Sequence, residues 1–507
     1  MTASRVEVRK GTYHDSVTLM QVSRQAEELP GVEAAAAVAA TPVNLELLGR
    51  QGFSVEEAGL GPSDLVICVR AADEEAAGQA MAQVEALLAG GGGAAGTGSG
   101  GVAVAPRSLR AAARRDPDLN LAVLSVPGRH LHYEIAEALQ AGLHVFCFSD
   151  GLDPATEAAR KREAAARGLL LMGPDCGTAI LDGVGLGFAN AVRWGPVGVV
   201  GASGTGIQEV TCLLDAAGVG VSHAVGVGGR DLSVTVGGTM TLRALELLAG
   251  DEPTRAILVI SKPPDRRVAE RVAAAAAATG KPAALAFPGM DAPPPAPAGV
   301  AFAGSLEAAA AWAAAGQGAG LPAGGADPWV VTPGAIRGLF SGGTLCYEAM
   351  AVVAAAAGRV ASNIPLRPEW RLHDAARSEG HTFVDFGDDA MTEGRAHPMI
   401  DPSLRAERFR REAADPETGV LLLDVVLGYG AHPDPAGELA PLVERALAPR
   451  PGGLSVVVAL CGAAGDPQGL DRQAALLRAA GALVTRSSAH AARLALAAAG
   501  LGHGAGP

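Results

Sequence analysis

The sequence of 507 residues is poor in aromatic residues, which make up 4% of the chain, although hydrophobic residues as a whole make up 49%. Small residues are abundant instead, with 68 glycines and many alanines. We therefore expect packed cores built mainly from Val, Leu, Ile and Ala. The length is sufficient for three or four domains of ordinary size.

Long basic runs and long apolar runs are both absent. The formal net charge is −13, and no segment gathers the lysines and arginines that binding to a phosphate backbone requires. No stretch of 18 residues is apolar and free of charge, glycine and proline, and the opening MTASRVEVRK lacks the apolar core of a signal peptide. We therefore expect a cytoplasmic protein with neither a nucleic-acid partner nor a membrane partner.

The six cysteines are scattered and form no CxxC pair. This pattern is typical of a reduced, cytoplasmic chain and provides neither a disulfide framework nor a zinc site. The aspartates and histidines of the last third also match no standard metal-ligand spacing. We expect no metal ion held by the protein. The cysteines are Cys68, Cys147, Cys176, Cys212, Cys346 and Cys461.

Apolar runs recur along the chain, each ending in Gly, Pro or Asp and each separated from the next by a helical pattern. Examples are LNLAVLSVP (119–127), LHVFCFSDG (143–151) and GVLLLDVVLG (419–428). Such runs are typical of strands buried on both faces of a parallel sheet, with helices as the crossovers. The sequence therefore predicts a multi-domain α/β protein.

Three Gly- or Pro-rich stretches (90–101, 288–299 and 316–328) have the composition of linkers or loops. Segment 1–90, with strand patterns such as DLVICVR, predicts a small N-terminal α/β domain. We place three further domains at 102–193, 194–315 and 330–500. In open parallel sheets, ligands bind beyond the carboxyl ends of the strands.

The segment GASGTGIQEV (201–210) has only small side chains where a strand passes into a helix. A helix N-terminus carries unpaired N–H donors and a partial positive charge, so an anion can bind there. Glycines let the backbone approach the anion closely. The predicted anion-binding residues of this loop are Ser203, Gly204, Thr205 and Gly206, and Glu209 follows them.

The segment FSGGTLCYEAM (340–350) repeats the pattern G-T-x-x-x-E with Gly343, Thr344 and Glu348. Two such loops in two similar α/β units predict a pseudo-twofold site in which both helix ends face one anion. As an alternative, each glutamate caps backbone groups or stays in solvent.

Arg230, in the glycine-rich segment VGVGGRDLSVTVGGTM (225–240), is a further candidate for binding phosphate or carboxylate. Its planar guanidinium pairs well with either group. A purely structural turn is the alternative for this segment. Cys176, in MGPDCGTAIL, has no recognisable histidine partner, so we do not expect a catalytic thiol.

The last third of the chain concentrates polar residues behind three predicted strands. If those strands are neighbours, their carboxyl ends bring the side chains together, as in many functional sites; ordinary Asp-Pro and His-Pro turns are the alternative. His397 and His432 are candidates for hydrogen bonding or general acid–base catalysis. The other candidates are Asp385, Asp388, Asp424, Asp434 and Arg395, with His381, Asp389, Asp401, Asp466 and Gln468 nearby.

The segment GVVGASGTGIQEVTCLLDAAGVGVSHAVGVGGRDLS (198–233) resembles the second domain of the succinyl-CoA synthetase α subunit and of related NDP-forming acyl-CoA synthetases. Residues 118–190 resemble their CoA-binding Rossmann domain. The resemblance implies a Rossmann-like, CoA-binding-type domain at 102–193. It also implies two flavodoxin-like, ligase-CoA-type domains at 194–315 and 330–500.

From about residue 7 to 498 the chain resembles the FdrA family. The motifs that carry this resemblance are GTYHDSVTLM, TPVNLELL, SVPGRHLHYEIAEALQAGLHVFCFSD, GASGTGIQEVT, GLFSGGTLCYEAM, HTFVDFGDD, GRAHPMIDP and LLLDVVLGYGAHPDP.

In the synthetases, the glutamate that matches Glu209 lies on a helix whose N-terminus holds a phosphohistidine, and a second helix end faces it from the partner domain that SGGTLCYEA resembles. Here Phe302 stands at the position of the phosphorylated histidine. The glycine-rich phosphate loop of a CoA-binding Rossmann domain is not recognisable before LNLAVLSVP either. Both departures argue against ATP-dependent CoA ligation.

The FdrA resemblance implies one component of an oxamate carbamoyltransferase in anaerobic allantoin breakdown. Carbamoyl phosphate or phosphate would bind at the two helix ends, with Glu209 and Glu348 as catalytic residues. The small carboxylate oxamate would bind to Arg230, Arg395 or the histidines. Other subunits of the carbamoyltransferase complex and a homo-oligomer are the implied partners.

Two alternatives differ from the carbamoyltransferase in class. One is an acyl-CoA synthetase that binds CoA and an acyl phosphate. The other is a non-catalytic scaffold subunit whose partner holds the active site.

Overall fold

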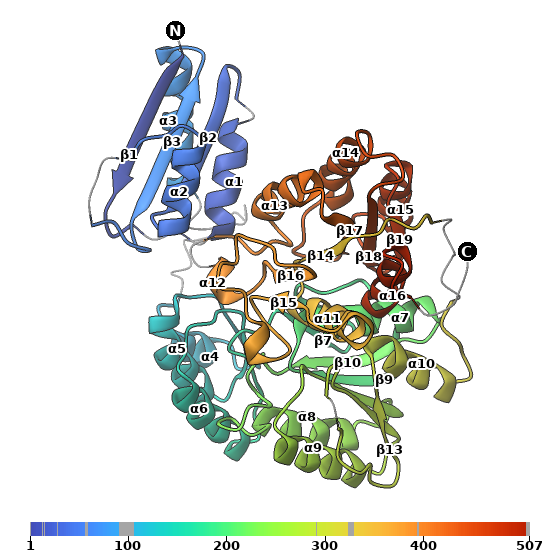
Figure 1. The fold of residues 1–507 in the computed structure, drawn as a ribbon. Coiled ribbons are helices and arrows are strands. Elements are labelled where there is room, and N and C mark those ends of the chain that lie inside the picture. Colours follow the sequence, from blue (N-terminus) through green and yellow to red (C-terminus); the bar gives the residue numbers. More distant parts are fainter. Residues whose placement is uncertain are drawn as a thin grey trace. The chain divides into compact units, whose positions relative to one another are not determined.

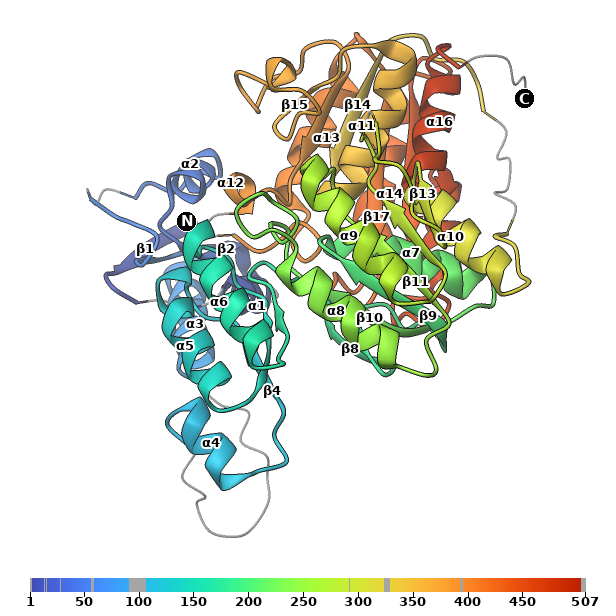
Figure 2. The ribbon, with the colours of Figure 1, turned by 90° about the horizontal axis from the view of Figure 1, so that it is seen from below.

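The computed structural model describes residues 2–12, 14, 16–27, 29–55, 59–90, 106–290, 292–322, 329–392 and 395–502. The chain divides into two compact units, shown in Figures 1 and 2. The N-terminal unit contains Met1–Val104 together with Gly387–Ser403. The main unit contains Ala105–Phe386 and Leu404–Pro507. Most of the predicted linker 90–101 lies outside the described residues.

The N-terminal unit is a small antiparallel sheet with helices on both faces. The strands β1 (Ala3–Arg9), β3 (Leu65–Ala71) and β2 (Val32–Ala39) pair in that order. One face packs on apolar residues of α1 (Ser16–Glu27) and α3 (Glu74–Gly90), and the other lies near α2 (Pro42–Arg50). The short helix α12 (Asp389–Thr392) belongs to this unit. This architecture confirms the predicted small α/β domain.

The main unit begins with a parallel sheet of three short strands, β4 (Leu121–Leu124), β5 (His144–Cys147) and β6 (Leu171–Met172). It is the part predicted to resemble a Rossmann domain. Helices α5 (Gly128–Gln140) and α6 (Pro154–Ala166) lie side by side along it (Figure 2), and α4 (Leu109–Arg115) packs on α5.

The next sheet has the strand order β13-β12-β11-β9-β10-β7-β8. The five strands from β13 to β10 are parallel, and the hairpin of β7 (Thr178–Leu181) and β8 (Val184–Gly187) joins the edge of β10 antiparallel. This hairpin lies before the predicted boundary at residue 193 but completes the following sheet, because it pairs with β10. The other elements are β9 (Trp194–Gly201), α7 (Gly204–Ala216), β10 (Val221–Gly226), α8 (Thr239–Gly250), β11 (Ala256–Ile260), α9 (Arg266–Ala278), β12 (Ala283–Ala286), β13 (Val300–Ala303) and α10 (Leu306–Gly316).

The last sheet is fully parallel, in the order β15-β16-β14-β17-β18-β19. Its first long strand, β14, holds the same central position as β9 in the preceding sheet, so the two sheets repeat one topology. The elements are β14 (Ala335–Phe340), α11 (Gly343–Ala357), β15 (Ala361–Ser362), the 3-10 helix Pro368–Trp370, β16 (Thr382–Asp385), α13 (Ser403–Ala414), β17 (Thr418–Val426), α14 (Pro435–Leu447), β18 (Ser455–Cys461), α15 (Leu470–Ala479), β19 (Leu483–Thr485) and α16 (Ser488–Ala498).

The central strands of the main unit are buried on both faces, as their apolar runs predict. All nine residues of β17 are buried, and so are all seven of β18. The structure thus confirms the multi-domain α/β fold with parallel sheets. Among the described helices, none combines the length and apolar character that crossing a bilayer requires.

A buried cluster of charged residues joins α6 to the loop that follows β10. The amino group of Lys161 lies 2.8 Å from a carboxylate oxygen of Glu157 and 2.9 Å from one of Asp231, and all three side chains are fully buried. Lys161 also donates to the carbonyl of Val227 at 2.8 Å. Asp231 in turn accepts from the backbone N–H of Thr241, in the first turn of α8. The cation therefore fixes the three-stranded part against the neighbouring sheet.

Replacing Lys161 with Met is expected to destabilise the main unit by about 3–5 kcal/mol, because it leaves the carboxylates of Glu157 and Asp231 buried without their cation. The shift in melting temperature measures this loss. The control is Arg167→Ala at the end of the same helix, which removes an exposed pair with Glu163 and should cost less than about 1 kcal/mol. A Lys161→Met protein that melts with the wild type would contradict this account of the cluster.

Candidate functional site

The N-termini of α7 and α11, one from each repeated sheet, are in direct contact. Ser203, the N-cap residue of α7, accepts the backbone N–H of Gly206 at 2.9 Å. The Ser203 hydroxyl also donates to the hydroxyl of Thr344, in the first turn of α11, at 2.6 Å. A Cβ added at Gly342 would lie 2.9 Å from the side chain of Thr205. The structure therefore brings the two predicted loops together at one place.

Several backbone donors of these helix ends have no acceptor in the chain. Within the described residues, five N–H groups of the two first turns donate to no other atom of the protein. Two N-terminal dipoles with unpaired donors form a field that favours an anion. The five donors belong to Gly204, Thr205, Gly343, Thr344 and Leu345.

The loop before α11 is held by a fully buried carboxylate. Asp424, within β17, accepts the N–H groups of Ser341 and Gly342 at 2.8 and 2.7 Å. The guanidinium of Arg405 lies 2.7 Å from the same carboxylate and donates to the Asp424 carbonyl. Both side chains are buried, so Asp424 acts as a positioning residue for the loop and its charge is balanced by Arg405.

Lys262 and Asp385 also reach the N-terminus of α11. A Cβ added at Gly343 would lie 2.6 Å from an Asp385 carboxylate oxygen and 3.2 Å from the Lys262 amino nitrogen. Lys262 follows β11 of the first repeated sheet, whereas Gly343 belongs to the second. Within the described residues, Lys262 forms no ion pair within 4 Å. Lys262 is not among the residues predicted from the sequence, because a single lysine after a strand matches no motif.

Glu209 and Glu348 cap helices of the opposite repeat. The N–H of Ser488, the first residue of α16, lies 3.2 Å from each carboxylate oxygen of Glu209. The N–H of Leu306, the first residue of α10, donates to Glu348 at 2.6 Å. The two glutamates therefore exchange contacts between the repeated sheets, and the capping alternative applies to both.

Burial makes both of these carboxyl groups weaker acids than an exposed glutamate. Burial raises the pKa of Glu348 to about 7, although the N–H of Leu306 opposes the shift. Burial, and then the nearby Glu348, raise the pKa of Glu209 well above its usual value. The Oε2 atom of Glu348 is buried without a hydrogen-bond partner among the described residues. Two close carboxyl groups of this kind favour retention of a proton at neutral pH.

Arg230 lies apart from these helix ends. It pairs with Glu157 at 3.0 Å and donates to the carbonyl of Leu152 at 2.7 Å. Its guanidinium is thus engaged at the junction between the loop after β10 and the α6 region. A buried carboxylate attracts a guanidinium strongly, and this contact holds Arg230 at the junction.

His432 and Asp434 form the cap of α14. The Nδ1 atom of His432 accepts the N–H of Asp434, and Asp434 accepts the N–H of Gly437 as the N-cap residue. Arg472 and Gln473 also donate to the Asp434 carboxylate. These contacts are those of a capped turn before α14.

Five other candidates belong to the N-terminal unit rather than to the unit of the helix ends. Arg395 donates to the side chain of Asn44 at 2.9 Å. His397 accepts the N–H of Met399, and Asp401 accepts that of Ser403. Asp388 and Asp389 lie at the start of α12 in the same unit.

In the main unit, two of the three strand ends bring a carboxylate to the N-terminus of α11. Strand β16, which ends at Asp385, pairs with β14 and not with β17. Asp424 lies inside β17, and Asp466, after β18, accepts from Asn190 and Ala463. Although β14 lies between β16 and β17, Asp385 and Asp424 both reach the turn that follows β14, whereas Asp466 contacts other groups.

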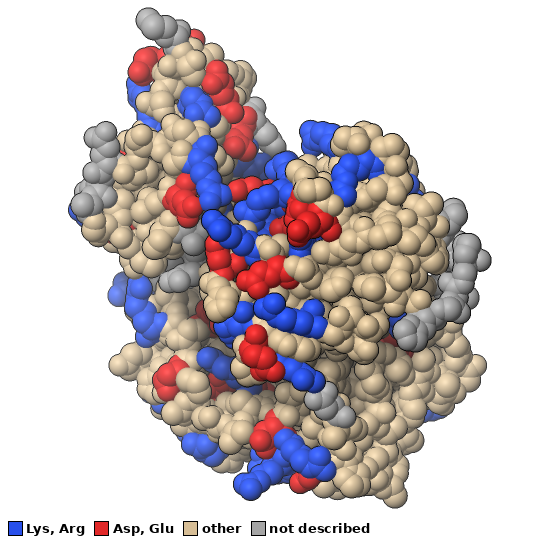
Figure 3. Space-filling model, viewed as in Figure 1, with Lys and Arg blue, Asp and Glu red and all other residues tan. Residues whose placement is uncertain are grey.

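On the face visible in Figure 3, basic and acidic side chains of the described residues are interspersed. Neither sign covers a broad continuous area of the main unit there. This distribution differs from the single-sign surface that binding to a phosphate backbone uses.

Family models match three parts of the chain. Residues 1–103 match an AllF, heavy metal-associated domain, residues 193–289 a CoA binding domain, and residues 339–498 a CoA-ligase. The CoA-binding match lies on the first repeated sheet, for which the sequence predicts a ligase-type domain, and not on 102–193.

YahF of Escherichia coli (strain K12) is 39% identical over 514 residues, which cover 97% of this chain and 98% of YahF. The chain belongs to the YahF family. Succinate–CoA ligase [ADP-forming] subunit alpha 2 of Archaeoglobus fulgidus is 30% identical over 152 residues, covering 29% of the chain and 52% of that subunit. The matches support the predicted acyl-CoA synthetase superfamily and do not single out FdrA.

Among solved structures, dinucleotide forming acetyl-coenzyme A synthetase 1 of Ca. Korarchaeum cryptofilum (apo form) matches 78% of this chain and 85% of its own. The identity is 17% and the TM-score 0.31. A similarity of this size carries no argument about function.

The described residues of the N-terminal unit do not fit the metal that its family description implies. Cys68 is the one cysteine of the N-terminal unit, and it is fully buried in β3. No group of three metal-ligating side chains occurs among the described residues. In the turn after β4, which lies before the CoA binding domain match, a Cβ on Gly128 would lie 2.8 Å from the carbonyl oxygen of Asp150, so this glycine serves close packing.

The raised pKa of Glu348 predicts a stability that falls as the pH rises. Between its usual value of 4.5 and about 7, the folded protein keeps a proton that the unfolded chain has lost. The contribution of Glu348 to the free energy of unfolding is therefore largest below pH 4.5. It declines by roughly 2–3 kcal/mol as the pH rises to 7. Glu348→Gln keeps an oxygen for Leu306 and removes the titration, so its melting temperature should vary less between pH 5 and 8.

The control is Glu444→Gln on the exposed side of α14, which should leave the pH dependence unchanged. If Glu348→Gln and wild type lost the same stability over this pH range, Glu348 would not carry the proton.

Proposed function

We propose that the chain is the component of a carbamoyltransferase that binds carbamoyl phosphate, with its phosphate between the N-termini of α7 and α11. The observation that carries the proposal is the contact of two helix ends with five unpaired N–H donors and the nearby amino group of Lys262. The FdrA resemblance of the sequence supports oxamate as the acceptor. Phe302 stands at the position of the phosphorylated histidine of the synthetases, which supports direct transfer of the carbamoyl group without a phosphohistidine.

In this reaction the oxamate nitrogen attacks the carbonyl carbon of carbamoyl phosphate. A carbon–nitrogen bond forms, the carbon–oxygen bond to phosphate breaks, and phosphate leaves with the electron pair. The departing phosphate accepts the proton that the nitrogen loses. Preorganised N–H donors and the Lys262 cation stabilise the negative charge that grows on this oxygen.

We assign the two predicted catalytic glutamates a positioning role. Glu209 and Glu348 hold the first residues of α16 and α10, and thereby fix the repeats that carry the two helix ends. Asp424 fixes the loop before α11 in the same way. Of the predicted oxamate ligands in the main unit, Arg230 pairs with Glu157 and His432 accepts the N–H of Asp434, whereas Arg395 and His397 belong to the N-terminal unit.

An acid–thiol ligase is the second candidate, and the CoA-binding and CoA-ligase matches favour it. Phe302, at the position of the phosphorylated histidine of the synthetases, argues against it. Phe302 packs on Phe287, with ring centroids 6.1 Å apart, just before α10. A thermal shift with CoA that exceeds the shift with carbamoyl phosphate would favour the ligase.

Lys262→Met is expected to lower kcat/KM for oxamate-dependent phosphate release from carbamoyl phosphate by roughly 10²–10³-fold, since it removes one charged ligand of the leaving group. The assay uses the chain co-purified with its partner subunits. Arg255→Met, a cation at the other end of β11, is the matched control and should retain activity. Release that is independent of oxamate, or unaffected by Lys262→Met, would contradict the proposal.

A further inference from the structure

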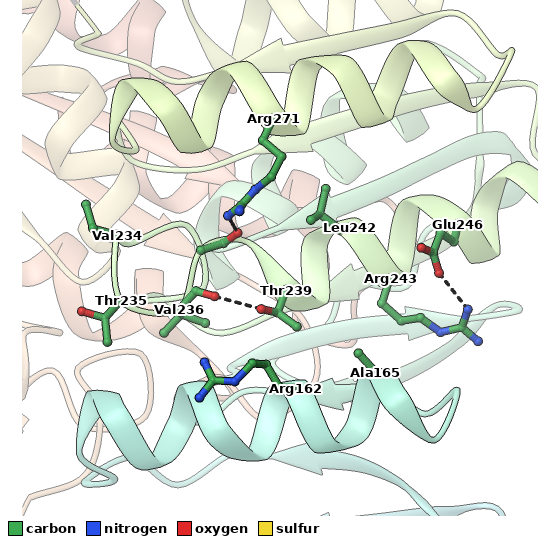
Figure 4. A pocket seen from close by; sticks show the side chains of 11 residues that line it. Arg162, Ala165, Val234, Thr235, Val236, Thr239, Leu242, Arg243, Glu246 and Arg271 are labelled. Atoms are coloured by element: carbon green, nitrogen blue, oxygen red, sulfur yellow. Dashed lines mark hydrogen bonds and ion pairs between the residues drawn. The ribbon is translucent and has the colours of Figure 1, made fainter.

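A cavity of about 470 Å³ lies between α6, the loop after β10, α8 and α9. Figure 4 shows its walls: Arg162 projects from α6, Arg271 from α9 on the opposite side, and Thr235 and Val236 line it from the loop. The volume falls within the range of small-molecule sites. None of its lining residues belongs to the helix-end site; those from Val234 to Arg271 fall within the CoA binding domain match, whereas Arg162 and Ala165 precede it.

The charged groups of the cavity are mostly cationic. Three guanidinium groups and one carboxylate line it, and the carboxylate, Glu246, is already paired with Arg243 at 3.0 Å. The Nε atom of Arg243 is buried without a hydrogen-bond partner among the described residues. In a chain of net charge −13, this local excess of positive charge requires a separate explanation.

The walls are held in place by contacts of their own. Arg271 donates to the carbonyl of Gly237, and the Thr239 hydroxyl donates to the carbonyl of Val236 at 2.8 Å (Figure 4). Arg243 reaches across to the carbonyl of Gly168, after α6, at 2.9 Å. The cavity is thus preformed, which lowers the ordering cost of binding.

An apolar surface lies beside the arginines. Ala165, Val236 and Leu242 line the cavity, and Val234 is 74% exposed at the loop. A ligand that combines an anionic group with an uncharged organic part matches this lining. Planar guanidinium groups pair with phosphate oxygens through two parallel hydrogen bonds.

We propose that this cavity binds a small phosphate ester of nucleotide size. The phosphate lies between Arg162 and Arg271, and the organic part lies on Val234, Val236 and Leu242. The proposal does not depend on the carbamoyltransferase function, because none of these residues contributes to the helix-end site.

Isothermal titration of the full chain with AMP, adenosine, inorganic pyrophosphate and citrate at about 150 mM salt tests the proposal. AMP and pyrophosphate are expected to bind, and adenosine to bind at least tenfold more weakly than AMP, since it lacks the phosphate. Citrate separates a phosphate site from a general polyanion site. Citrate binding as tight as that of AMP would overturn the assignment to phosphate esters.

Arg162→Ala and Arg271→Ala should each weaken AMP binding by about tenfold or more, because each removes a charged hydrogen-bond donor. Arg266→Ala, an exposed arginine of α9 that pairs with Glu270, is the matched control and should bind as the wild type does. Equal melting temperatures show that the variants fold. The proposal fails if no phosphate compound binds, or if Lys262→Met weakens binding while Arg162→Ala does not.

Discussion

The hydrogen bond between Ser203 and Thr344 joins the two repeated sheets at the point where each places a helix N-terminus. Since a bond of 2.6 Å between two short side chains leaves little freedom, the helix ends have a fixed separation. Glu209 and Glu348 reinforce the arrangement from inside, because each caps a helix of the other repeat. The two first turns face each other, and their free N–H groups donate to no atom of the described residues, although the Asp385 carboxylate lies beside Gly343.

The same arrangement sets a charge balance at the N-terminus of α11. Asp424 and Asp385 bring negative charge to that end, and Arg405 and Lys262 bring positive charge. Asp424 and Arg405 form a buried ion pair, and Asp424 accepts the N–H groups of the loop before α11. Lys262 reaches the N-terminus of α11 from the opposite repeat on a long, exposed side chain. An anion that binds between the helices therefore meets backbone donors on both sides and one adjustable cation.

Sequence patterns predicted the layers of the fold well, because long apolar runs such as those of β17 and β18 are compatible with few structures other than a buried parallel strand. They also located both helix ends, because the small residues between a strand and a helix can be recognised within one short segment of sequence. The hairpin β7–β8 was missed, because its four-residue strands carry little periodic signal.

Such patterns do not predict contacts between residues that are distant in sequence. Glu209 meets Ser488 across 279 positions, and spacing within one helix does not reveal that partner. His397 and Asp385 are close in sequence yet belong to different units, because the chain leaves the main unit at residue 387 and returns at 404. Lys262 owes its place to the packing of the two repeats, which no segment of sequence encodes alone.

The central claim is that both helix ends hold one anion. A crystal structure of the protein with inorganic phosphate tests it most directly. The account predicts tetrahedral density that contacts N–H groups of Gly204 or Thr205 on one side and of Gly343 or Thr344 on the other, with Lys262 turned towards it. Phosphate bound at one helix end only, or ordered elsewhere while this place stays empty, would contradict it.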